Sequence, residues 1–267
     1  MDYNAYNGPK MTRAQIDAYL ARIGVEGPVT TDLAGLAKLQ KAHQETVPFE
    51  NLDILAGIHM TLDHEGLFEK IVNRRRGGVC AELNTSFNWL LYSLGFDVTS
   101  YNSRIASQGD IQFRRHRVLG VALPDGTYTT DVGFTTETAR CPLRLEAEVV
   151  QSDGYCEYVY HKDPFYGWFL MQKRPGEEWR PSLGFTEEPQ IDLDFVTPMF
   201  YYEKHPDSNM NKIPRVSYYT DGGGILALRG GCLLEELAGQ VQTSVTITDQ
   251  AEEKRLIRET FHLPTEY

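Results

Sequence analysis

Several features that would assign the chain to a familiar class of protein are scarce or missing. No apolar run approaches the roughly 18 residues of a membrane-spanning helix, and the polar start of the chain lacks the apolar core of a signal peptide. Positive charge is in the minority, because 26 lysines and arginines face 37 aspartates and glutamates for a net charge of −11. Such a chain does not attract phosphate backbones. We therefore expect a cytoplasmic protein whose partners are neither nucleic acids nor membranes.

Cysteine is also scarce, with only Cys80, Cys141, Cys156 and Cys232 among 267 residues. No two of them have CxxC spacing, so the sequence gives little support for a zinc or redox site, and we expect no metal. In a reducing cytoplasm the thiols stay free. Each is expected to be a buried, inert thiol unless its neighbours indicate otherwise.

The first third of the chain carries helical signals. Thr12 and Gln15 form a capping-box pattern, and apolar residues then recur at helical spacing as far as Gly24. The same spacing predicts three further helices, which start at Asp32, near Leu67 and just after Cys80.

Short β-type runs replace these signals from about Asp97. Two runs that flank Pro124-Asp125-Gly126 predict a hairpin. Further strands are expected in 157–174, ILALRGG and SVTITD, and an amphipathic helix in 250–262. The proline-, charge- and glycine-rich segment 174–224 is expected to run over the surface. Because 267 residues are near the ceiling for one hydrophobic core, we expect two or three lobes around a cleft.

Cys80 departs from the expectation of an inert thiol because of its neighbours. Gly77 and Gly78 permit a sharp backbone turn, and a predicted helix starts immediately afterwards. The unpaired N–H groups and the dipole at a helix start stabilise a thiolate, and Arg74–Arg76 add positive charge. The same N–H groups are suited to receive a developing oxyanion. Cys80 is therefore the candidate nucleophile.

A nucleophilic thiol needs a base, and the base needs a group that orients it. Of seven histidines, His116 opens a predicted strand, and Asp131 follows across the hairpin turn in a strand with a buried face. The simplest register, with Leu123 opposite Thr127, places Asp131 opposite Leu119. The hairpin thus brings the two side chains near each other, and a bulge or twisted edge must complete the contact.

Four segments carry a resemblance to a known family: VPFENLD at 47–53, RGGVCAELN at 76–84, RHRVLGV at 115–121 and DVGF at 131–134. In this order and at these separations they closely resemble the motifs of the arylamine N-acetyltransferases. Weaker similarity covers nearly the whole chain and includes HPDSN and the closing EEKRLIRETFHL. Any one motif alone would be a weak signal, whereas the joint match is specific.

The resemblance implies an α+β fold in three parts, with the core of papain-like and transglutaminase-like thiol enzymes. The parts are a helical bundle over 1–98 with the cysteine, a β-barrel over 99–200 with the histidine and aspartate, and an α/β lid over 201–267. It also implies a Cys80–His116–Asp131 triad and ping-pong transfer from acetyl-CoA. The thiolate takes the acetyl group and releases CoA, and an aromatic amine or hydrazine then attacks the thioester as His116 accepts its proton.

The resemblance further implies a substrate pocket that Phe49, Gly133 and Phe134 line. Arg115 stands where relatives often have threonine, and it is either a solvated charge at a strand end or a contact to CoA phosphates or an acidic acceptor. Relatives commonly follow DVGF with glycine. Here Thr135-Thr136-Glu137 follows, which is expected to narrow the mouth of the pocket or change the acyl group that fits.

CoA carries several negative charges, and the chain carries a net charge of −11. A local basic rim is therefore expected, and the candidates are Arg74–Arg76 and Arg114–Arg117.

Two other functions stay open. An amide synthase or another acyltransferase would use the same triad, and a non-catalytic relative would bind CoA or aromatic ligands without turnover.

Arg229-Gly230-Gly231-Cys232 repeats the shape of the Cys80 motif but lacks the histidine and aspartate motifs after it, so we predict a turn with a buried cysteine. Asp221-Gly222-Gly223-Gly224 lacks the lysine of a phosphate loop and is expected to be a flexible turn. The acceptor amine and the oligomeric state stay undetermined.

Overall fold

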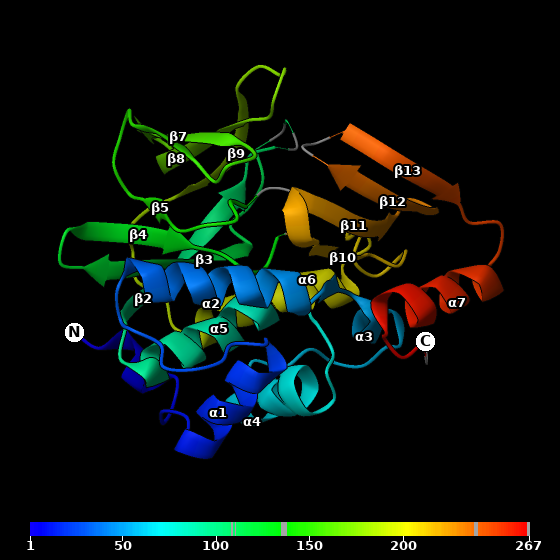
Figure 1. The fold of residues 1–267 in the computed structure, drawn as a ribbon, viewed down its shortest axis with the longest axis horizontal. Coiled ribbons are helices and arrows are strands. Elements are labelled where there is room, and N and C mark those ends of the chain that lie inside the picture. Colours follow the sequence, from blue (N-terminus) through cyan, green and yellow to red (C-terminus); the bar gives the residue numbers. More distant parts are fainter. Residues whose placement is uncertain (108, 110, 135–137, 238–239, 266–267) are drawn as a thin grey trace.

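The computed structural model describes residues 1–107, 109, 111–134, 138–237 and 240–265. Helices of the first third form the lower layer of the molecule, and two sheets stand side by side above them (Figure 1). Among the described residues no helix is both long and apolar enough to cross a membrane. The expected continuation Thr135-Thr136-Glu137 lies outside the described residues.

The predicted helices of the first third are present, and their caps are those the sequence indicates. Thr12 and Gln15 form the capping box of the first main helix, Asp32 caps the second, and Gly95 ends the cysteine helix in the left-handed conformation at φ 101°. The helical segments are η1 (Tyr3–Tyr6), α1 (Arg13–Arg22), α2 (Leu33–Thr46), α3 (Leu52–Leu55), α4 (His64–Phe68), the π-helical turn η2 (Glu69–Asn73) and α5 (Cys80–Leu94).

Eight strands form one antiparallel sheet in the order β5-β4-β3-β2-β9-β8-β7-β6. They are β2 (Asp97–Ile105), β3 (His116–Leu123), β4 (Gly126–Thr130), β5 (Leu143–Arg144), β6 (Val150–Ser152), β7 (Glu157–Asp163), β8 (Gly167–Lys173) and β9 (Arg180–Phe185). The sheet curls into a nearly closed barrel. Its edge strands meet where the Gln151 side chain accepts a hydrogen bond from the Arg144 N–H at 2.7 Å and donates to the Arg144 carbonyl at 2.9 Å.

The second sheet has the order β1-β10-β11-β12-β13. Its strands are β1 (Phe49–Glu50), β10 (Val216–Tyr219), β11 (Gly224–Arg229), β12 (Cys232–Leu237) and β13 (Gln240–Thr246). The remaining helical segments are η3 (Asp192–Phe195), α6 (Val196–Lys204), η4 (Asp221–Gly223) and α7 (Gln250–Phe261). Strand β1 comes from the PFEN motif, so this sheet joins chain segments more than 150 residues apart.

The prediction of a surface run over 174–224 is wrong. Strand β9 lies in the middle of the barrel sheet, between β2 and β8, and α6 packs Met199 and Tyr202 into the main core. Proline and glycine suggested a loop, but both are accommodated within β9. Pro181 pairs with Met171 where the register shifts, and Gly184 lies under the Tyr166 ring, where a β-carbon would come within 2.5 Å.

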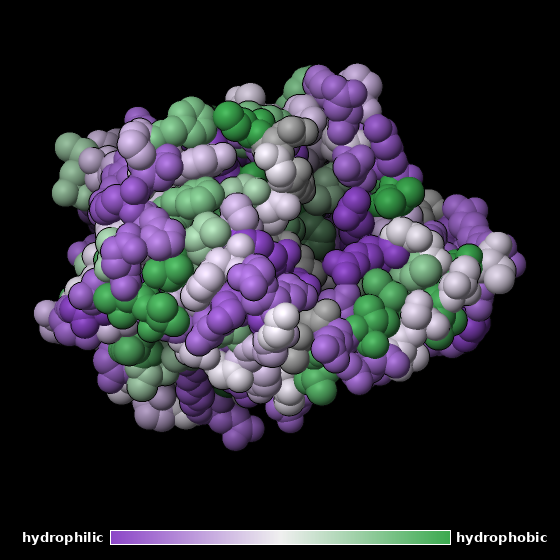
Figure 2. Space-filling view, turned by 90° about the horizontal axis from the view of Figure 1, so that it is seen from above, coloured by the Kyte–Doolittle hydropathy of each residue, from purple (hydrophilic) through white to green (hydrophobic). Residues whose placement is uncertain are grey.

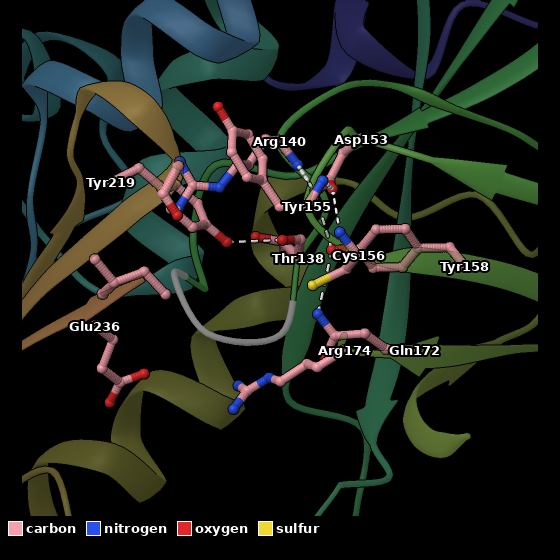
Figure 3. A pocket seen from close by; sticks show the side chains of 12 residues that line it. Thr138, Arg140, Asp153, Tyr155, Cys156, Tyr158, Gln172, Arg174, Tyr219 and Glu236 are labelled. Carbon is pink, nitrogen blue, oxygen red and sulfur yellow. Dashed lines mark hydrogen bonds between the residues drawn. The ribbon is translucent and has the colours of Figure 1, made fainter. Parts of the chain in front are cut away.

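The Asp221–Gly224 segment is a packed joint rather than the flexible turn we expected. A β-carbon on Gly223 would lie 1.9 Å from the Tyr155 ring of the barrel. Arg140 donates to the carbonyls of Gly223 and Gly224 at 2.6 Å each, and its guanidinium lies over the rings of Tyr155 and Tyr219 (Figure 3). This arrangement, the Arg140 joint, holds the barrel against the second sheet.

Candidate active site

Cys80 is the first residue of α5, as the sequence predicts, and only 4% of it is exposed. The Glu82 side chain accepts a hydrogen bond from the Val79 N–H at 3.0 Å, and its other oxygen accepts one from Lys70 at 2.9 Å. Helix α5 packs directly on β2 and β3 of the barrel. The cysteine therefore lies where the helical layer meets the barrel.

The glycines before Cys80 serve close approach rather than the sharp turn we expected. A β-carbon on Gly77 would lie 1.9 Å from the Pro48 carbonyl oxygen, and one on Gly78 would lie 2.8 Å from Glu82. Because neither glycine has a β-carbon, Gly78 can pair with Phe49. The Glu50 N–H donates to the Gly78 carbonyl at 2.9 Å. The PFEN and RGGVC motifs are thus held side by side.

His116 opens β3, and Asp131 follows the last residue of β4. The predicted register is wrong by one residue, because Leu123 pairs with Gly126 and Leu119 with Thr130. Continued by one residue, the observed register places Asp131 across from Val118, which shares a strand face with His116. A one-residue shift moves a side chain to the other face of a sheet. His116 and Asp131 are therefore diagonal neighbours on one face of the sheet, and His116 Nε2 is hydrogen-bonded to Asp131 Oδ2.

The other oxygen of Asp131 is held by two donors. Asn84 Nδ2 and the Gly133 N–H both donate to Oδ1 at 2.8 Å, and Asn84 Oδ1 accepts from the Val132 N–H at 3.0 Å. Asn84 lies one turn after Cys80 on the same face of α5. One helix therefore positions both the sulfur and the carboxylate.

The electrostatics of the site favour a charged imidazole. Burial disfavours the imidazolium, but the Asp131 carboxylate and the Cys80 sulfur outweigh burial and raise the pKa of His116 to about 10. With Nε2 engaged by Asp131, His116 Nδ1 is the ring nitrogen left for the sulfur. The structure thus brings together the three residues predicted from the sequence.

A cleft lies between the barrel and the second sheet. One part has a volume of about 360 Å³, and the adjoining part shares Phe134, Met210 and Arg215 with it. The surface is hollowed between the two halves of the molecule when seen from above (Figure 2). Phe49 lines the smaller part and Arg115 the larger part, and the ring centroid of Phe134 lies 5.6 Å from that of His116.

Gly133 lies against the nucleophile itself. A β-carbon there would lie 2.7 Å from Cys80 Cα and 2.7 Å from Asn84 Nδ2. The glycine of DVGF is therefore required for the close approach of the aspartate segment to the start of α5.

Two of the arginines that we expected in a basic rim are buried in ion pairs instead. Arg76 contacts Glu50 at 2.7 Å and Asp53 at 2.8 Å, and Arg117 contacts Asp192 at 2.6 Å. Arg115 lines the cleft, and both readings of its charge stay open. Arg215 and Arg229, which the sequence analysis missed, also line the cleft.

Tyr202 is a further residue that the sequence analysis missed. Its hydroxyl lies 4.0 Å from Cys80 Sγ. Phe195, Met199 and Tyr202 recur at helical spacing, and this signal could have identified α6 as a buried helix.

The other three cysteines lie away from the triad. Cys232 pairs with Arg229 across a two-residue hairpin turn in which Gly230 and Gly231 have φ values of 60° and 75°. The predicted turn is present, but Cys232, like Cys141 and Cys156, is half-buried rather than fully buried. Within the described residues, no three His, Cys, Asp or Glu side chains are grouped so that they could hold a metal ion.

A thiol next to a carboxylate-bound imidazole, close to a cleft, is the arrangement of thiol enzymes that transfer acyl groups. Comparisons with known proteins agree with this class. A family model described as N-acetyltransferase matches residues 32–266. The arylamine N-acetyltransferase of Mycolicibacterium smegmatis is 38% identical over 215 residues, which cover 77% of each chain.

Solved structures agree as well. The arylamine N-acetyltransferase of Salmonella typhimurium superposes with a TM-score of 0.88 at 30% identity, over 95% of this chain and 92% of that chain. The Mycobacterium marinum enzyme in complex with CoA superposes with a TM-score of 0.85 at 29% identity, over 92% of each chain. The protein therefore belongs to the arylamine N-acetyltransferase family and is an acyltransferase.

Proposed function

We propose that the chain transfers an acetyl group from acetyl-CoA to an aromatic amine or hydrazine by a ping-pong mechanism. Cys80 is the nucleophile, His116 the base and Asp131 the group that orients the base. The observation that carries the proposal is the hydrogen bond between His116 and Asp131, which leaves the other imidazole nitrogen for the Cys80 sulfur.

In the first half-reaction the Cys80 thiolate attacks the thioester carbon of acetyl-CoA. The N–H groups of the first turn of α5 have no acceptor within their own helix, and they stabilise the developing oxyanion. The bond between carbon and the CoA sulfur then breaks, and CoA leaves. Since one thioester replaces another, the step requires little net free energy.

In the second half-reaction the neutral amine attacks the acetylated sulfur, and its proton passes to His116. Against the effect of burial, Asp131 contributes most to the raised pKa of His116, and negative charge on Cys80 adds to it. Acetylation removes that negative charge, so the imidazole loses its proton more readily. His116 is then the base that the amine needs.

We place the substrates in the cleft. Phe49, Phe134 and Gly133 line the acyl and amine pocket, and the anionic CoA enters past Arg115 together with Arg215 and Arg229. The positive charge at this rim supports the assignment: burial and the neighbouring Arg229 together lower the pKa of Arg215, as expected of clustered cations. For the fold, we propose a papain-like and transglutaminase-like core, with 201–267 as the lid over 1–98 and 99–200.

Loss of one rim charge should weaken CoA binding more than chemistry. We expect Arg215→Gln to raise the KM for acetyl-CoA about tenfold with kcat nearly unchanged, because a charged phosphate contact is removed. Arg114→Gln is the control, since Arg114 pairs with Glu188 and lines neither part of the cleft. Equal KM values for the two variants would contradict the placement of CoA.

Intact-protein mass spectrometry tests the mechanism. Acetyl-CoA should add one acetyl group to the wild type, and addition of aniline should remove it. We expect Cys80→Ala to abolish both changes and Cys232→Ala to leave them intact. Normal turnover by Cys80→Ala would refute the proposal, and absence of CoA release from the wild type would favour an amide synthase or a ligand-binding relative.

A further inference from the structure

Tyr202 of α6 is a buried tyrosine whose hydroxyl lies at the nucleophile. Its side chain belongs to the main core and is 3% exposed. The hydroxyl lies 3.2 Å from the Arg115 carbonyl oxygen, to which it donates, and 4.0 Å from Cys80 Sγ. The Ser208 hydroxyl donates to the Tyr202 carbonyl at 2.9 Å and ties the segment after α6 back to the helix.

The hydroxyl has one hydrogen and two acceptors within reach. Burial, and then the charge of Cys80, raise the pKa of Tyr202 well above its ordinary value, so the phenol keeps its proton. A carbonyl oxygen is the better acceptor when the sulfur is neutral, and a thiolate competes with it when the sulfur is charged. The Arg115 carbonyl also lies 3.9 Å from Sγ, so the hydrogen bond can change acceptor with little movement of the ring.

We propose that Tyr202 is a further catalytic residue, whose hydroxyl donates a hydrogen bond to the Cys80 sulfur whenever that sulfur carries negative charge. The inference rests on the proposed function of Cys80. In the second half-reaction the carbon–sulfur bond breaks, its electron pair passes to Sγ, and the amine proton passes to His116. Tyr202 keeps its own proton and turns its O–H from the Arg115 carbonyl to the departing thiolate.

The two half-reactions depend on this hydrogen bond in opposite ways. The bond is lost as the thiolate attacks acetyl-CoA, and it is gained as the thiolate leaves the acetyl group. Removal of the hydroxyl should therefore slow deacetylation and not acetylation. A purely structural role for Tyr202 would slow both steps together, because a displaced sulfur is misplaced for both.

Rapid-mixing measurements of the separate half-reactions test the proposal. In Tyr202→Phe, which keeps the ring, we expect the rate of acetyl transfer to aniline to fall about tenfold, the effect of one hydrogen bond to a charged group. The rate of acetylation by acetyl-CoA should change less than about threefold, and acetyl-enzyme should accumulate during turnover. Tyr128→Phe is the matched control, because Tyr128 is a buried tyrosine whose hydroxyl donates to Asp125 and which does not line the cleft.

The outcomes separate the two proposals. Equal losses in both half-reactions, or no loss in either, would overturn the role of Tyr202, and thermal unfolding of the variant shows whether equal losses arise from a disturbed fold. A wild type that forms no acetyl-enzyme would overturn the proposed function itself. Slow deacetylation in Tyr128→Phe as well would show that the effect does not come from the Tyr202 hydroxyl.

Discussion

Gly133 links the aspartate motif to the cysteine helix through space that a side chain would fill. A β-carbon at this position would lie within 2.7 Å of Cys80 Cα. Neither the DVGF segment nor α5 can move without disturbing Asp131, because Asn84 of α5 and the Gly133 N–H both donate hydrogen bonds to its carboxylate. The DVGF segment or the start of α5 must therefore move if the glycine is replaced.

We expect Gly133→Ala to lower kcat/KM more than about 100-fold, because small displacements of catalytic groups are costly. Its free energy of unfolding should fall by about 1–3 kcal/mol. Gly154→Ala is a control, since its φ of 88° is strained for alanine but open space surrounds it. The control should lose stability and keep activity when both variants are assayed by urea unfolding and acetyl transfer. Wild-type activity in Gly133→Ala would contradict the close approach.

Residue-level reasoning predicted the triad because each member has a local signal. Cys80 follows two glycines at a helix start, and His116 and Asp131 flank one hairpin. Tyr202 and Arg215 had no comparable signal. Their approach to the cleft depends on α6 and β10, which are distant in sequence from the four main motifs.

Helix α2 carries a histidine that is entirely buried. His43 Nε2 lies 3.0 Å from the Tyr19 hydroxyl, and the ring packs edge-on against Phe87 at 5.3 Å. Burial, with a smaller contribution from the Arg22 charge, lowers the pKa of His43 to about 3. An unfolded histidine titrates near pH 6.5. Between these values the unfolded chain binds a proton that the folded chain does not.

The free energy of unfolding should therefore fall as the pH is lowered from about 6.5 toward 3, by at most about 1.4 kcal/mol per pH unit from this residue. We expect His43→Gln to flatten the acid dependence, although it loses ring packing at every pH. Urea unfolding at several pH values measures the difference. The half-exposed His161→Gln is the control and should keep the wild-type slope. The same acid slope in His43→Gln would show that other groups cause it.

At the level of elements, caps and periodicity predicted the helices, and the hairpin turn predicted β3 and β4. The register was wrong by one residue, because turn residues alone do not show which pair closes the loop. Strand β9 was missed because Pro181 and Gly184 resemble loop residues, and only contacts with β2 and β8 accommodate them.

The whole molecule depends on how the barrel and the second sheet are joined. Arg140 comes from the barrel side, and its acceptors Gly223 and Gly224 come from the second sheet. The Tyr219 hydroxyl donates to the Thr138 carbonyl at 2.7 Å and adds to the same joint. The cleft lies between the same two sheets that this joint connects.

We expect Arg140→Gln to lower the free energy of unfolding by about 2–3 kcal/mol, because charged hydrogen bonds to two carbonyls are lost. The cleft should also widen, with a higher KM for acetyl-CoA. Arg144→Gln is the control, because Arg144 is a half-exposed arginine of the same barrel. Urea unfolding and steady-state kinetics of both variants measure the effects. Equal stability of the two variants would contradict a structural role for the Arg140 joint.

The sequence by itself determined the local structure and the identity of the chemical groups. Helix caps and hairpin turns act between residues that are close in the chain, so their positions can be read from spacing. The tertiary structure alone decided the His116–Asp131 register, the burial of Arg76 and Arg117, and the position of Tyr202 at the sulfur. These features depend on packing between segments that no local pattern relates.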